Sequence, residues 1–72
     1  MTPYKSLTKK QFNSMADQLI NLGALAETQE APSGYKVYKI KTPKGKVVFK
    51  ATITTDDEIH ASWVDGLFDV RN

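Results

Sequence analysis

The residues that could do chemistry in this chain are few, and they gather in one short segment. Three acidic residues, at positions 56–58, lie just before the only histidine, His60. Carboxylates beside an imidazole are a donor set for a divalent metal ion. Neighbouring residues of a strand point to opposite faces of a sheet, however, so this spacing gives a turn followed by one outward imidazole. We therefore expect no metal site and no cofactor.

The same scarcity bears on catalysis. The chain has no cysteine, one histidine and four isolated glycines. Acid–base or nucleophilic chemistry needs a second histidine, a cysteine or two carboxylates enclosed in a cleft, and a phosphate-binding loop needs closely spaced glycines. A chain of 72 residues forms one domain, too small to enclose a drug-sized pocket. We expect a protein that is not an enzyme and that binds its partner stoichiometrically.

A run of lysines gives the first candidate binding surface. Residues 31–50 carry six lysines and no acidic residue, whereas residues 51–72 carry five acidic residues and one arginine. Lysines neutralise phosphates and tyrosines stack on unpaired bases, but base edges are usually read by arginine. The alternative is that the lysines only keep an edge strand from pairing with other chains. The candidate partner-binding residues here are Lys39, Lys41, Lys44, Lys46, Lys50, Tyr35 and Tyr38.

An apolar segment near the C-terminus gives the second candidate surface. Five of the eight residues from Trp63 to Val70 are large and apolar. Contiguous exposed apolar area marks a partner or dimer interface, and aromatic side chains are preferred anchors there. Trp63 and Phe68 are therefore candidate partner-binding residues, and the alternative is that both belong to the core of the domain.

The first half of the chain predicts one helix, over residues 9–22. Thr8 and Gln11 have the spacing of a capping box, in which each side chain accepts from the other residue's backbone N–H. Gly23 supplies the left-handed residue that ends a helix. The apolar residues between these signals recur with helical spacing at Phe12, Met15, Ala16, Leu19, Ile20 and Leu22.

The second half predicts an antiparallel β-meander over residues 35–70, after a linker at residues 26–34 that has room for a short strand at 25–28. A Pro-Lys-Gly turn at residues 43–45 joins the first two strands. Alternate residues from Val47 to Ile53 form the core face of the second strand. A four-residue loop would place Tyr38 and Ile40 of the first strand on the same face. A three-residue loop with a bulge at Gly45 would place Tyr35 and Val37 there instead. A third strand follows at residues 58–64, and residues 67–70 form a fourth edge strand or a half-turn.

These patterns predict an α+β fold in which an N-terminal helix packs on one face of a three- to four-stranded antiparallel meander. No window approaches the ~18 apolar residues of a membrane span, so we expect a cytoplasmic protein. The leading hypothesis is protein–protein binding of the inhibitor or adaptor type, a size class that phages and mobile elements use against host proteins. Nucleic-acid binding by the hairpin 35–50 is the alternative, and either function is compatible with a homodimer.

Overall fold

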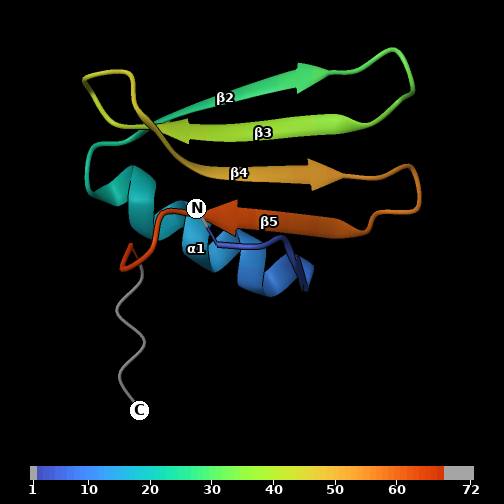
Figure 1. Ribbon diagram of the computed structural model, residues 1–72, viewed down its shortest axis with the longest axis horizontal. Coiled ribbons are helices and arrows are strands. Elements are labelled where there is room, and N and C mark those ends of the chain that lie inside the picture. The colour runs from blue at the N-terminus through green and yellow to red at the C-terminus, as the bar shows by residue number, and fades with distance from the viewer. Residues whose placement is uncertain (1, 68–72) are drawn as a thin grey trace.

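The computed structural model describes residues 2–67 as one helix packed on a five-stranded sheet (Figure 1). The α+β class is confirmed, with five strands where the sequence predicts three or four. In chain order the elements are β1 (Lys5–Leu7), α1 (Lys9–Asn21), β2 (Leu25–Glu30), β3 (Lys36–Lys41), β4 (Val47–Ile53) and β5 (Ile59–Trp63).

The sheet is antiparallel throughout and has the order β1-β5-β4-β3-β2. Strands β2 to β5 form a meander in which each strand pairs with the next along the chain. Strand β1 joins the free side of β5, so the first two strands of the chain form the two edges of the sheet. The helix connects these edges.

The predicted helix over residues 9–22 is confirmed, since α1 spans Lys9–Asn21. The Thr8 side chain accepts from the Gln11 backbone N–H at 3.1 Å, and the Gln11 side chain accepts from the Thr8 N–H at 3.0 Å. Phe12, Ala16 and Leu19 form the buried stripe of α1, at the i, i+4, i+7 spacing of one helix face.

The core lies between this stripe and one face of the sheet. Ile40 and Phe49 are completely buried and stand opposite each other on β3 and β4. The Phe12 ring contacts the Phe49 ring, with centroids 6.1 Å apart, and meets the Tyr38 ring edge-on at 5.1 Å. Aromatic pairs of this geometry stabilise beyond the area they bury.

Three hairpin connections share one turn geometry. Each has three loop residues, the last in the left-handed region: Gly34 at φ 87°, Gly45 at φ 89° and Asp57 at φ 64°. In each the residue before the loop donates its backbone N–H to the carbonyl of the residue after it, as Thr42 does to Lys46 at 2.8 Å. Only glycine adopts this conformation without steric cost, so Asp57 is the strained member.

The register of the β3–β4 hairpin combines the two alternatives that the sequence leaves open. The loop is the three-residue form, with Gly45 at positive φ, yet Ile40 pairs with Phe49 and so lies on the core face, the face that a four-residue loop would give it. A register shift next to Lys41 inserts Val48 as an extra residue and restores the alignment. Val48, which the alternation from Val47 assigns to the outer face, is buried, with 8% of its surface exposed.

Two further expectations have different outcomes. The short strand that the sequence allows at residues 25–28 is present as β2 and is longer than expected, because it spans Leu25–Glu30, so only the turn at residues 31–35 remains of the predicted linker at residues 26–34. Pairing with β3 makes this strand, which has no alternating apolar pattern of its own. The predicted fourth edge strand at residues 67–70 lies outside the described residues from position 68 onward.

Candidate functional site

The sheet face away from the helix holds three of the predicted lysines. Lys39 and Lys41 flank the buried Ile40 on β3, and Lys50 lies between the buried Phe49 and Ala51 on β4. Because side chains alternate along a strand, all three lysines point to the open side. We call Lys39, Lys41 and Lys50 the lysine face.

Two lysines of this face stand directly opposite each other. Lys39 of β3 and Lys50 of β4 are register partners, and both side chains are partly buried. Like charges directly opposite on antiparallel strands destabilise the pair. Neither ammonium group has an ion-pair partner among residues 2–67. The carboxylate of Glu27, the register partner of Lys39 on β2, attracts Lys39 without forming an ion pair with it. Lys39 and Lys50 therefore hold positive charge that residues 2–67 offset only in part.

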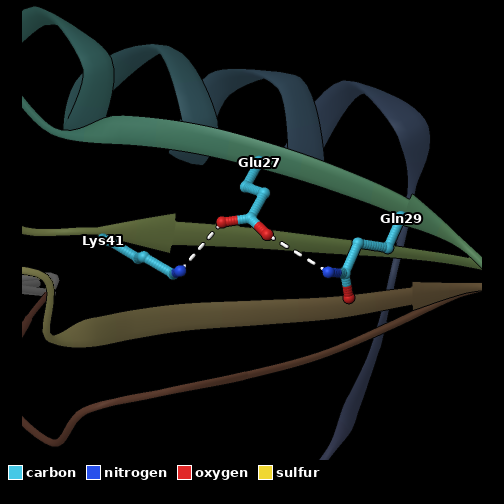
Figure 2. Close-up of polar contacts among 3 residues, drawn as sticks. All are labelled: Glu27, Gln29 and Lys41. Atoms are coloured by element: carbon cyan, nitrogen blue, oxygen red, sulfur yellow. Dashed lines mark hydrogen bonds and ion pairs between the residues drawn. The ribbon is translucent and has the colours of Figure 1, made fainter.

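The third lysine is neutralised by a carboxylate from β2. Lys41 Nζ lies 2.8 Å from Glu27 Oε2, and Gln29 Nε2 donates to the other carboxylate oxygen at 3.2 Å (Figure 2). The hydrogen bond from Lys41 lowers the pKa of Glu27 below its ordinary value, helped by the charges of Lys41 and, more weakly, Lys39. Glu27 is therefore held ionised within a basic surface.

The surroundings of the lysine face are mixed in character. Tyr35 and Val37 continue the open side of β3, Thr52 continues that of β4, and His60 and Ser62 lie on the open side of β5. Tyr35 has 40% of its surface exposed. The arrangement can accept an anionic surface that also presents hydrogen-bonding groups.

The remaining predicted lysines continue the positive charge past the end of the sheet. Lys44 and Lys46 lie in the exposed β3–β4 turn, drawn in yellow in Figure 1. Tyr38 does not join them. It occupies the helix face, where its ring meets Phe12, which is the face that the four-residue alternative for the loop assigns to it.

The predicted apolar surface near the C-terminus is only partly described. Trp63 lies on the core side, half-buried and stacked on Phe49 with ring planes 8° apart, and Lys5 Nζ lies 5.8 Å from its ring centroid. Part of its ring contributes to the core, as the alternative interpretation held. Phe68 lies outside the described residues.

The acidic segment before His60 forms a turn and a single side-chain contact. His60 Nε2 lies 3.3 Å from Glu58 Oε2. Within residues 2–67 no three His, Cys, Asp or Glu side chains are grouped so that they could hold a metal ion. A surface depression of about 420 Å³ lies elsewhere and is lined by Leu7, Lys10, Gln11, Ser14 and Met15.

Sequence reasoning missed two features of the surface. Glu27 lay in a presumed linker, so its place beside the lysines required the pairing of β2 with β3. The second is an exposed apolar corner where α1 leads into β2. Leu22 is 83% exposed and Leu25 is 62% exposed. Both features depend on β2, of which the sequence indicates no more than a short strand at residues 25–28.

Comparison with known proteins adds no relative. A scan against protein-family models and searches of curated proteins and solved structures found no match. Among residues 2–67, no helix has the length and apolar character that crossing a bilayer requires. Inference about function therefore starts from the geometry of the sheet.

Proposed function

We propose that the protein is a non-catalytic binding module whose lysine face docks on an acidic surface of another protein, as an inhibitor or adaptor would. The observation that carries this proposal is the opposed pair Lys39 and Lys50. Their repulsion costs the isolated domain stability. A carboxylate of a partner placed between the two ammonium groups relieves that cost and gains charge-assisted hydrogen bonds.

The mixed character of the surface favours a protein over a nucleic acid. Glu27 lies ionised beside Lys39 and Lys41, and a phosphate backbone passing over this row would meet its negative charge. A protein surface can present a donor to Glu27 and carboxylates to the lysines. Complementary charges of this kind direct partner choice and speed association more than they raise affinity.

Nucleic-acid binding is the second candidate, and the β3–β4 turn favours it. Lys44 and Lys46 extend the positive charge beyond the sheet in an exposed turn, and Tyr35 offers an exposed ring at the other end of β3. Phosphate neutralisation by these lysines would give binding that weakens steeply with salt. No arginine lies among residues 2–67, so such binding by the lysines of this part of the chain would show little sequence preference.

One NMR titration separates the two candidates. The labelled protein is titrated with a glutamate-rich peptide and with mixed-sequence single- and double-stranded oligonucleotides, at low and physiological salt. The proposal expects saturating shifts at Lys39, Lys50 and Thr52 with the peptide, persisting at physiological salt. Tighter binding of an oligonucleotide through residues 39–50 would favour the second candidate. No shift with either probe would overturn both.

A matched pair of variants shows whether the lysine face is responsible. K39Q/K50Q removes two charges from this face, and K9Q/K10Q removes two from the exposed first turn of α1. Peptide binding should weaken roughly tenfold in the first variant and stay within about twofold in the second. Equal weakening in both would show that net charge attracts the probe and would contradict a defined site.

A further inference from the structure

The two edges of the sheet differ in how they are protected. Strand β1 has three residues, follows Pro3 and carries Lys5, features that discourage pairing with another chain. Strand β2 has six residues, no proline and an uninterrupted register with β3. Within residues 2–67 no segment pairs with its outer side. Figure 1 shows β2 at the rim of the sheet.

The backbone groups that β2 offers outward follow from the turn that ends it. The Ala31 N–H donates to the Tyr35 carbonyl at 2.8 Å, so the polar backbone groups of Ala31 face β3. Along an antiparallel strand these groups alternate in direction. Those of Ala26, Thr28 and Glu30 therefore face away from the sheet, where three N–H and three C=O groups can form a second ladder.

Exposed apolar side chains flank this edge on the open face. Leu25 begins β2 and is 62% exposed, and Tyr35, across from Ala31, is 40% exposed. Both belong to the open side of the sheet, at opposite ends of the β2–β3 hairpin. If β2 of a second copy pairs antiparallel with β2, the Leu25 end of one hairpin lies beside the Tyr35 end of the other.

We propose that the protein forms a two-fold symmetric dimer by antiparallel pairing of β2 with β2 of a second copy, with the two Thr28 residues opposite each other. In this register Ala26 pairs with Glu30 of the second copy, and Glu27 faces its Gln29. Leu25 faces Ala31 of the second copy and reaches toward its Tyr35. The two sheets become one sheet of ten strands.

Charge and backbone direction together select this register. Only residues with outward backbone groups can form hydrogen-bonded pairs, so the register must match even-numbered residues of one copy with even-numbered residues of the other. A shift one way sets Glu27 against Glu27 at close approach, which is repulsive. A shift the other way matches Ala26 with Pro32, which lacks an N–H. The Thr28-centred register instead places a carboxylate opposite an amide, twice.

The dimer also has a geometric consequence. A two-fold axis perpendicular to the sheet keeps both helices on one side and both lysine faces on the other. The pairing itself does not involve the lysine face, so dimerisation and the proposed function stand or fall separately. Because edge pairing buries a small area, we expect association in the micromolar range.

Opposite substitutions at Gln29 test the register in the full chain. Q29E sets two pairs of carboxylates against each other across the interface, and Q29K sets two ammonium groups against the Glu27 carboxylates. By sedimentation equilibrium, Q29E should raise the dimer dissociation constant roughly fivefold to tenfold, and Q29K should lower it by a similar factor. Glu27 of the same chain is a neighbour in monomer and dimer alike, so its effect largely cancels.

Control variants and amide exchange complete the test. Q18E and Q18K make the same charge changes on the exposed side of α1 and should leave the dissociation constant within about twofold. In the wild-type protein, exchange of the Thr28 amide should slow as concentration rises. A monomer throughout the micromolar range overturns the proposal. A dimer whose dissociation constant is unchanged by Q29E and Q29K also overturns it, as does a dimer in which the β1 amides are protected from exchange and the Thr28 amide is not.

Discussion

The two faces of the sheet are built from alternating residues of the same strands, yet one face is packed against the helix and the other is open and carries lysines. On the helix face Ile40, Phe49 and Ala51 are completely excluded from solvent. On the open face, one position away along the chain, Lys39 and Lys50 stand directly opposite each other, and neither forms an ion pair within residues 2–67. A shift of one residue in the β3–β4 register would exchange the two sets. The comparison shows that the register determines, as much as the composition does, which side chains of these strands are buried and which are exposed.

The largest expected effect is on the helix face. Phe49→Ala removes a fully buried ring that contacts Phe12 and Trp63, and should lower the free energy of unfolding by about 3–5 kcal/mol. A domain of this length has about 4–11 kcal/mol to lose, so the variant should be near complete unfolding. Urea denaturation followed by circular dichroism measures it.

The matched change on the open face is Lys50→Ala, at the next residue along β4. It should alter the free energy of unfolding by no more than about 0.5 kcal/mol, because it removes no core contact. A cost for K50A comparable with that of F49A would contradict the division into a packed face and an open face.

The turn that sets the register should give the next largest effect. Gly45 has φ 89°, so Gly45→Ala is strained although nothing lies within 4 Å of the added Cβ. We expect a loss of about 1 kcal/mol in the free energy of unfolding. Asp57 occupies the same position of the β4–β5 turn at φ 64°, so Asp57→Gly should be neutral or stabilising. Thermal unfolding of both variants checks this contrast in sign.

The helix was predictable, because local signals specify it, whereas the sequence left two assignments of the β3 residues to faces open. The capping box and the helical spacing of apolar residues place α1, and the alternation around Ile40 separates Tyr38 from Lys39. The Gly45 turn was also visible. The bulge at Val48 was not, because it corrects a register that only long-range packing with the helix selects.

The outer strands were the least predictable part of the fold. β1 is three residues long, and β2 has a polar sequence with no alternating pattern, so both are strands because a neighbour offers hydrogen bonds. The same is true of the part of the candidate site that lies on β2. Lys39, Lys41 and Lys50 were identified from charge alone, whereas Glu27 could be placed among them only through the pairing of β2 with β3.

A smaller effect, of opposite sign, is expected on the open face. Lys39→Gln removes one of two opposed charges and should raise the free energy of unfolding by about 0.5 kcal/mol. Lys50→Gln should do the same, and K39Q/K50Q should gain little more than either single change, because the repulsion is removed only once. Lys44→Gln, in the exposed turn, is the control and should change little. Equal gains at all three sites would contradict a specific repulsion.

The free energy of unfolding at alkaline pH should depend on a residue of the helix face, Tyr38. Burial raises the pKa of Tyr38 above its ordinary value of 10.0, and the charge of Asp17 adds to the shift. The folded state thus favours the neutral phenol. This contribution is fully present below pH 10 and is lost as the pH rises through the folded pKa. Urea unfolding from pH 9 upward should therefore lose stability less steeply in Tyr38→Phe than in the wild type.

The free energy of unfolding at acid pH should depend on a residue of the open face, Glu27, and this is the smallest effect that we expect. The Lys41 hydrogen bond lowers the pKa of Glu27 below its ordinary value of 4.5, so the folded state favours the carboxylate. That contribution is present above pH 4.5 and is lost as the pH falls through the lowered folded pKa. Solvent screens so exposed a pair, so Glu27→Gln should reduce the acid dependence of urea unfolding only slightly. A large reduction would mean that the open face stabilises the fold as well as presenting charge, and the contrast between the two faces would fail.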